Sequence, residues 1–285
     1  MAVIAFATCR ELPDVQPDDA PIADALRAMG HEVRLLPWNG PFAPFAASDL
    51  VAVRSTWDYA DAPSAFLGWL RELEDAQLRV TNAPSLMRWN ARKDYLIDLA
   101  ARGAPLAPTR LVEPDADAIR HAMIDLELEE AVVKPVFGAG ASGLSIVRRD
   151  DVASLVDAAG QLGYDGLVQP LIPEIRSAGE VSLTFVGDEY SHAALKQTAP
   201  GSILIHAEHG GSTAPYVASS EMVEVAREVL AMLPEPADYA RVDLVPTLGG
   251  VVLMEVELIE PELFVLHCDG AAARFARFLA ARASR

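Results

Sequence analysis

A glycine-rich stretch between two apolar segments is the feature that most limits the fold of this chain. Residues 131–134 form a predicted strand, residues 137–144 carry three glycines, and residues 145–147 form a second predicted strand. Strand, glycine-rich turn and strand together predict a β-hairpin. The P-loop and the Rossmann dinucleotide fold are disfavoured, because each places its glycines directly before a helix and with a different spacing.

Apolar runs and helical patterns alternate along the first 84 residues. Four runs predict strands and two amphipathic patterns predict helices, namely residues 3–7, 31–36, 49–53 and 78–81 for the strands, and 21–29 and 64–76 for the helices. This alternation is typical of an open α/β domain. We therefore expect residues 1–84 to form an N-terminal α/β domain.

The rest of the chain divides into two further parts. Two helices are predicted next, one that Ser85 can cap and another over residues 90–101, and they lead into the segment that contains the glycine-rich hairpin. The last third is richer in predicted strands and ends in an amphipathic helix. We expect a central subdomain over residues 85–165 and a C-terminal α+β subdomain over residues 166–285.

The chain carries a formal net charge of −18, which disfavours partners that are polyanions. No local basic patch interrupts this charge, so nucleic acid is not an expected partner. A nucleotide would have to be held by individually placed lysines and a divalent metal ion. The only lysines are Lys93, Lys134 and Lys196, and they are the first candidates for that role.

Two cysteines, Cys9 and Cys268, are too few for a disulfide framework or a cysteine metal cluster. The apolar start of the chain lacks the basic segment of a secretion signal, and no run approaches the roughly 20 apolar residues that span a bilayer. We therefore expect a cytoplasmic protein without a membrane partner. The sequence leaves the oligomeric state open, a homodimer included.

Lys134 ends an apolar strand shortly before the glycine-rich stretch. Backbone N–H groups at Gly138, Gly140 and Gly143 could close over a phosphate without side-chain clashes, and Ser142 adds a hydroxyl donor. A surface lysine beside an ordinary glycine turn is the alternative. Because a phosphate site must open and then exclude water, we also expect this hairpin to act as a mobile cover.

Three carboxylates near the end of the chain form a second candidate site. Asp243 lies in one predicted strand, and Glu255 and Glu257 lie in the strand after a Leu-Gly-Gly turn. Side chains two residues apart in a strand share a face, and cross-strand pairing would bring Asp243 beside the glutamates. Such carboxylates repel one another unless a hard cation lies among them, so we expect Mg²⁺ or Mn²⁺ here. A solvated acidic face is the alternative.

These features occur in the order found in the ATP-grasp superfamily, which the chain resembles over nearly its whole length. The segments that carry the resemblance are Lys93, Lys134-Pro135, the glycine-rich hairpin, residues 169–172, Gly179-Glu180, Arg241-x-Asp243 and Glu255-x-Glu257. Within the superfamily the chain is most similar to the glutathione-synthetase-like ligases that include the cycloserine-forming cyclo-ligase. This finer resemblance rests on residues 54–59, 89–93, 179–183, 191–196 and 258–264.

The resemblance implies an ATP-grasp fold preceded by an N-terminal α/β domain, with ATP and magnesium as cofactors. Lys93 and Lys134 would hold the α- and β-phosphates beneath the glycine-rich hairpin. Asp243, Glu255 and Glu257 would hold the metal ion. The remaining ATP contacts would be main-chain hydrogen bonds to adenine and a ribose contact, from Gln169, Pro170, Leu171, Ile172 and Glu180.

One segment departs from the relatives. Where they carry an arginine near the transferred phosphate, this chain has Leu204. The candidate catalytic residues are therefore Arg241, Lys196 and His206, with His209 as an alternative to His206.

Four residues are expected to contact the substrate. Arg54 and Asp58 follow a buried strand, where open α/β sheets bind ligands, and Gly211 and Ser212 complete the set. The implied reaction phosphorylates a small amino-acid-like carboxylate, and an amine then captures the acyl phosphate as an amide. Two alternatives stay open: closure of one molecule that supplies both groups, and a regulatory ATP-binding protein whose catalysis is impaired by Leu204.

Overall fold

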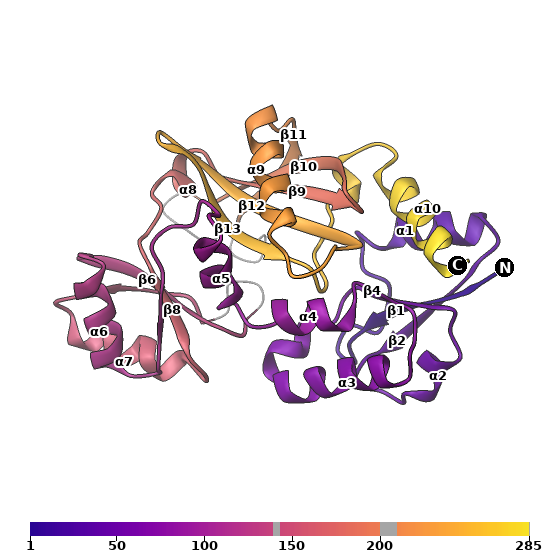
Figure 1. Cartoon of the computed structure of the whole chain (residues 1–285), viewed down its shortest axis with the longest axis horizontal. Helices are drawn as coiled ribbons and strands as arrows, with labels where there is room; N and C mark the ends of the chain where they lie inside the picture. Colours follow the sequence, from indigo (N-terminus) through magenta and orange to yellow (C-terminus); the bar gives the residue numbers. More distant parts are fainter. Residues whose placement is uncertain (139–142, 200–209, 285) are drawn as a thin grey trace.

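The computed structural model describes residues 1–138, 143–199 and 210–284. Within these ranges the chain forms three sheets, each in a body of its own (Figure 1). The central body lies at one end of the molecule and the N-terminal body at the other, with the large C-terminal sheet joining them. The mixed α/β fold predicted from the sequence is confirmed.

The N-terminal sheet is parallel, with strand order β2-β1-β3-β4. Its strands are β1 (Val3–Thr8), β2 (Glu32–Pro37), β3 (Leu50–Val53) and β4 (Val80–Thr81), and its helices are α1 (Ala20–Ala28), α2 (Ala43–Ala46) and α3 (Pro63–Asp75). All four residues of β3 are buried, as expected for a central parallel strand with both faces covered. The carboxyl ends of β1 and β3 therefore meet at one edge, where the chain continues into Cys9 and Arg54.

The central sheet is antiparallel, with order β5-β8-β6-β7. Its elements are β5 (Arg110–Val112), α6 (Ala116–Asp125), β6 (Glu130–Pro135), β7 (Ser145–Arg148), α7 (Val152–Gln161) and β8 (Gly166–Gln169). The pairing of β6 with β7 confirms the predicted hairpin. β8 pairs with β5 and β6, so this sheet extends past the boundary expected at residue 165.

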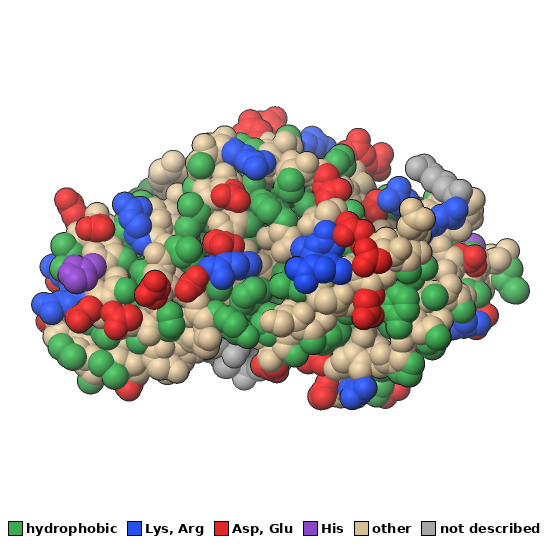
Figure 2. Space-filling view, turned by 60° about the horizontal axis from the view of Figure 1, so that its bottom comes forward, with side chains coloured by type: hydrophobic (Ala, Val, Ile, Leu, Met, Phe, Trp, Pro, Cys, Tyr) green, Lys and Arg blue, Asp and Glu red, His purple; other side chains and the backbone are tan. Residues whose placement is uncertain are grey.

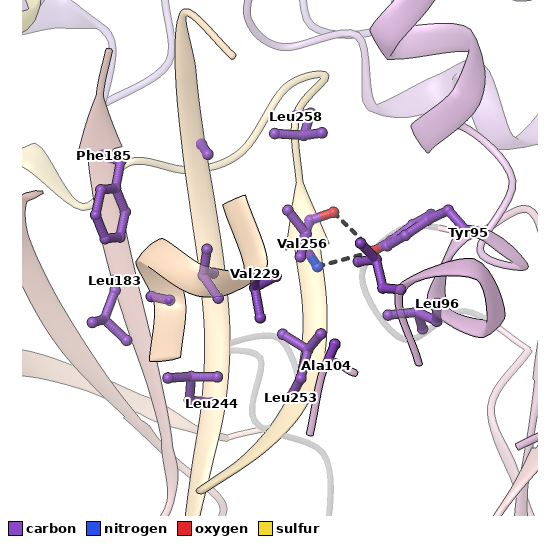
Figure 3. Packing of buried hydrophobic residues seen from close by; sticks show 14 of the residues in the cluster. Tyr95, Leu96, Ala104, Leu183, Phe185, Val229, Leu244, Leu253, Val256 and Leu258 are labelled. Carbon is purple, nitrogen blue, oxygen red and sulfur yellow. Dashed lines mark hydrogen bonds between the residues drawn. The ribbon is translucent and has the colours of Figure 1, made fainter. Parts of the chain in front are cut away.

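The C-terminal sheet has order β11-β10-β9-β12-β13 and is antiparallel. Its elements are α8 (Glu174–Ser177), β9 (Glu180–Val186), β10 (Glu189–Gln197), β11 (Ser212–Tyr216), α9 (Ser220–Ala231), β12 (Tyr239–Thr247) and β13 (Gly250–Glu257). Leu183, Leu244, Leu253 and Val256 pack with residues of α9 and of the linker in one apolar core (Figure 3). This core gives the strands that carry the predicted charged residues a fixed support.

The linker between the first two bodies is two short helices, α4 (Pro84–Asn90) and α5 (Tyr95–Ala101). Two helices are predicted here from the sequence, but the second begins at Tyr95 and not at Asn90 as expected. Ser85 does not cap the first, because it lies inside the first turn of α4. Tertiary contacts hold the chain between the two helices. Asn90 bonds the backbone of β13 and the residue after it, and Tyr95 both donates to and accepts from the backbone of Val256 (Figure 3).

The C-terminal helix α10 (Ala271–Ala283) packs against α1, which lies near the other end of the sequence (Figure 1). Phe275 and Leu279 are buried in one cluster with Ile4, Ile22 and other residues of the N-terminal domain. The last segment of the chain therefore ties the C-terminal sheet to the N-terminal domain.

None of the helices in the described ranges is both long and apolar enough to cross a membrane. On the face shown in Figure 2, Lys and Arg side chains lie among Asp and Glu side chains, with hydrophobic side chains between them. That face therefore presents no continuous field of one sign.

Candidate active site

Lys93 and Lys134 come together where the linker meets the central sheet. Lys134 lies near the end of β6, and the backbone N–H of Lys93 donates to the carbonyl of Val136 (2.8 Å). Lys93 contacts the carboxylate of Glu255, whereas Lys134 has no ion-pair partner within the described ranges. Burial and the neighbouring Lys93 lower the pKa of Lys134 to about 7. Two neighbouring ammonium groups repel each other, and an anion bound between them would relieve that repulsion.

Lys196 is placed very differently, because it is buried between two carboxylates. Its Nζ lies 2.5 Å from Glu180, its partner across β9 and β10, and 2.9 Å from Asp243 of β12. All three side chains are at most 7 % exposed. Glu180, which was predicted to contact ribose, is an ion-pair partner of Lys196 here, and its contact with ribose stays a prediction.

Arg241 belongs to the same cluster of charged side chains as Lys196, Glu180 and Asp243. Arg241 and Asp243 stand opposite Glu257 and Glu255 in the β12–β13 ladder, so the predicted cross-strand placement is confirmed. The Arg241 guanidinium donates to both oxygens of Asp243 (3.0 Å at the closest) and contacts Glu257. Burial alone would raise the pKa of Asp243, but Arg241 and Lys196 lower it below its usual range. Asp243 is therefore ionised at neutral pH.

The residues fit a divalent metal ion in part. Glu255 and Glu257 share one face of β13 and are 25 % and 30 % exposed, so their oxygens are within reach of an ion. Asp243 is buried, and both its oxygens already accept hydrogen bonds, from Ser182, Lys196 and Arg241. The three carboxylates do not converge on one point. Among the described residues, the only group of three His, Cys, Asp or Glu side chains with ligand atoms within 4.8 Å of one another is Cys9, Glu11 and Asp58.

Glu260 is a buried carboxylate near Glu257 and Lys93 to which no role was assigned from the sequence. Burial and the neighbouring Glu257 raise the pKa of Glu260 to about 8. The loop that carries it is held by the N-terminal domain: Trp57 donates to the carbonyl of Glu260 (3.3 Å), and Asp18 accepts the backbone N–H groups of Leu263 and Val265 (2.7 Å each). The only signal was its place in residues 258–264, which contributed to the resemblance and not to any assigned role.

The predicted adenine segment follows β8, and its last residue, Ile172, packs with Val245 and Met254 of the C-terminal sheet. Gln169 is buried, and its amide donates to Thr109 (2.8 Å). The next three residues, Pro170, Leu171 and Ile172, follow the last residue of β8 outside any strand and are half-buried. Their main-chain contacts with adenine stay a prediction.

The glycine-rich hairpin is described only at its two ends. Gly143 has a φ of +73°, and a Cβ there would lie 3.1 Å from the Pro135 side chain, so the turn itself requires glycine. Gly138 is buried just beyond β6. The other predicted residues, Gly140, Ser142, Leu204, His206 and His209, lie outside the described residues.

The four predicted substrate contacts lie in three places. The Arg54 guanidinium is buried, donating to Asp19 (2.8 Å) and to the carbonyl of Pro261 (2.9 Å), so it links two segments of the fold and its contact with substrate stays a prediction. Asp58 instead lines a cavity and accepts bonds from Trp38 and Asn39. Gly211 and Ser212 lie at the start of the edge strand β11, next to the strand of Lys196.

Comparisons with known proteins agree with this geometry. The chain matches the family model of the ATP-grasp domain over residues 105–257, and the model of the N-terminal domain of D-cycloserine synthetase DcsG over residues 4–82. It is 29 % identical to the cycloserine biosynthesis protein DcsG of Streptomyces lavendulae, over 99 % of both chains. The crystal structure of D-cycloserine synthetase DcsG superposes with a TM-score of 0.85, at 27 % identity and 99 % coverage of both chains. A D-alanine–D-alanine ligase from Bacillus anthracis shares the fold, with a TM-score of 0.71 at 12 % identity, over 100 % of this chain and 98 % of that one.

The chain belongs to the ATP-grasp family, since the ATP-grasp model covers more than half of it. It is an ATP-dependent ligase of the ADP-forming kind that makes C–N bonds, as the predicted resemblance implied.

Proposed function

We propose that this ligase phosphorylates the carboxylate of a small amino-acid-like molecule with ATP and joins the resulting acyl phosphate to an amine nitrogen. ATP and the carboxylate give ADP and the acyl phosphate; the amine then gives the amide and inorganic phosphate. One observation carries the proposal: the side chains of Lys134 and Lys93 are neighbours, and Glu255, one of the two glutamates of β13, contacts Lys93. A triphosphate with a metal ion matches that pair of charges.

Phosphate binding requires an exchange of partners in this cleft. In the structure Lys93 is engaged by Glu255, and Arg241 by Glu257. We infer that phosphate oxygens take over these two cations. The carboxylates are then free to bind a cation themselves. Among Lys93, Lys134, Lys196 and Arg241, Lys134 alone has no carboxylate partner within the described residues, so it would make the first contact.

A divalent metal ion, when bound, neutralises charge on the transferred phosphate. Glu255 and Glu257 would hold it, and Asp243 would join them if Lys196 or Arg241 turned toward phosphate. Arg241 and Lys196 would then stabilise the charge of the phosphoryl group, which is the role proposed for Leu204's counterpart in relatives. Glu180 and Asp243 keep both cations in place until then.

The test is ADP release with Mg²⁺ over a panel of amino acids and their derivatives. We expect release that depends on one carboxylate and one amine, and its loss in Glu255→Gln, which removes a charged ligand without changing size. Glu189→Gln, on an exposed position of the same sheet, is the matched control. Wild-type turnover in Glu255→Gln with unchanged thermal stability would remove Glu255 from the metal site.

A second candidate is closure of a single molecule that supplies both the carboxylate and the nitrogen. It is favoured by the match of residues 4–82 to the N-terminal domain of D-cycloserine synthetase, a domain outside the ATP-grasp region. Mass analysis of the product separates the two reactions. Condensation gives the summed mass of two substrates less one water, whereas closure gives the mass of one substrate less one water.

A further inference from the structure

The N-terminal domain contains a cavity of about 640 Å³ that is lined by none of the predicted ATP or metal residues. Its walls are the segments that follow β1, β2 and β3, together with one side of α3. The chain passes from β1 to β2 on one side of β1 and then to β3 on the other. Such a reversal at the carboxyl edge of a parallel sheet is where α/β domains bind ligands.

The cavity is lined by acidic side chains. Glu11, Asp58, Asp61 and Glu72 all contribute, and none of the described lining residues is Lys, Arg or His. Oxygens of Glu11 and Asp58 and the thiol sulfur of Cys9 lie within 4.8 Å of one another. Burial and the adjacent Glu11 raise the pKa of Asp58. Carboxylates gathered this closely favour a cationic ligand.

Aromatic rings form the other part of the wall. Trp38 and Trp69 line the cavity, and their ring centroids lie 6.1 Å apart. The indole N–H of Trp38 donates to Asp58 (2.5 Å), and Asn39 donates to its other oxygen (2.8 Å), so this carboxylate is held in one orientation beside the indole. Indole faces attract organic cations, and they attract them more strongly where water is partly excluded.

A glycine in α3, which has no side chain, leaves the cavity open on that side. Gly68 lines it in the middle of the helix, and a Cβ added there would meet no atom within 4 Å. Glycine in a helix interior costs about 1 kcal/mol relative to alanine, so a side chain could be added here at no steric penalty and with a gain in helix stability. The position therefore offers a way to fill the cavity without disturbing the fold.

We propose that this cavity binds a small organic cation, an amine or guanidine with an apolar body. The carboxylates of Glu11 and Asp58 neutralise its charge, and the indoles of Trp38 and Trp69 cover its apolar part. None of its lining residues is among the predicted ATP or metal residues, and only Asp58 is among the predicted substrate contacts. The proposal does not depend on the reaction that the cleft catalyses.

The experiment titrates benzylamine and agmatine, with uncharged benzyl alcohol as comparison, into the whole protein without nucleotide and with a metal chelator present. Tryptophan fluorescence and calorimetry report binding. We expect saturable binding of at least one cation, and binding of benzyl alcohol weaker by about tenfold or more, which corresponds to about 1.4 kcal/mol. Equal binding of the charged and uncharged probes, or no saturable binding of either cation, would overturn the proposal.

Variants locate the site. The double variant Glu11→Gln with Asp58→Asn should weaken cation binding by about tenfold or more. Asp75→Asn, at the exposed end of α3, should leave it unchanged. Gly68→Met should block the cavity. Gly160→Met, in α7 and equally free of steric contact, is its matched control, because it shows what a helix Gly→Met change does to folding away from the cavity. Unchanged binding in Gly68→Met would contradict the site.

A metal ion is the competing occupant. Cys9→Ala should leave benzylamine binding intact, because Cys9 does not line the cavity. If Zn²⁺ binds instead, is lost in Cys9→Ala, and the amines fail to bind, the group is a metal site and the proposal is wrong.

Discussion

Arg54 and Lys134 each stand at the end of an apolar strand, and the sequence makes both of them candidates for binding a ligand. The structure separates them. The Arg54 guanidinium is paired with Asp19 and Pro261 and lies over the rings of Tyr239 and Phe275, with centroid distances of 5.5 and 5.6 Å. Lys134 has no ion-pair partner among the described residues, and burial lowers its pKa.

The difference teaches that the partner of a buried cation decides its role. Arg54 meets a carboxylate from α1's start and a carbonyl from the far end of the chain, so its charge is used to hold the N-terminal domain to the C-terminal segment. Lys134 is half-buried and has no ion-pair partner within the described residues, so its charge bears a desolvation cost that Glu180 only partly offsets. We infer that the Lys134 ammonium is offset by a bound ligand that supplies the missing anion.

The largest expected effect is on stability, in Arg54→Met. Removal of one member of a buried ion pair leaves Asp19 buried without its cation, which should cost about 3–5 kcal/mol of unfolding free energy. Urea denaturation measures it, with Arg71→Met as the control because Arg71 is exposed on α3. A loss no larger than the control's would mean that Arg54 is open to solvent and that substrate contact must be reconsidered.

Lys134→Met should do the opposite. The ammonium is disfavoured in the folded protein, so its removal should raise the unfolding temperature by about 2–4 °C. The folded pKa of about 7 lies below the ordinary 10.5, so the penalty is complete below pH 7 and fades as the pH rises toward 10.5. The gain should therefore be largest in acidic buffer.

Lys196→Met provides the contrast for that measurement. Lys196 is partnered by Glu180 and Asp243, so its loss should lower the unfolding temperature at neutral pH. If both lysine variants shifted the unfolding temperature in the same direction, the distinction between partnered and unpartnered cations would fail.

The smallest expected effect is a proton taken up on binding. With a pKa of about 7, roughly half of the Lys134 side chains are neutral at pH 7, and phosphate should restore the charge. Binding of a magnesium ATP analogue should then take up about half a proton at pH 7 and more at pH 8. Calorimetry in buffers of different ionisation enthalpy measures this uptake, and Lys134→Met should abolish it. An uptake that Lys134→Met leaves unchanged would assign the proton to another group.

The sequence was sufficient for what depends on local pattern. The parallel N-terminal sheet, the β6–β7 hairpin and the β12–β13 ladder with its two glutamates on one face all follow from apolar runs and a period of two. β11 was missed, because Pro215 and polar neighbours on an exposed edge give no alternating pattern. α2 and α8 have four residues each, too few for a helical period.

The rest depended on contacts between distant segments. The start of α5 at Tyr95, later than the sequence predicts, is explained by bonds to β13, which lies about 160 residues away in sequence. The partners of Arg54, Asp19 and Pro261, are distant in sequence as well. Glu260 is buried because Trp57 and neighbouring residues of the N-terminal domain cover its loop. No local pattern encodes such meetings.

The measurement that tests the central claim most directly is calorimetric titration of a non-hydrolysable magnesium ATP analogue into the wild type and Lys134→Met, with Arg71→Met as control. The account predicts that Lys134→Met, fully folded and at least as stable as the wild type, binds the analogue about tenfold or more weakly, as expected for the loss of a charge-assisted bond worth about 1.5–3 kcal/mol. An affinity equal to the wild type's would show that Lys134 does not meet the phosphates and would contradict the account.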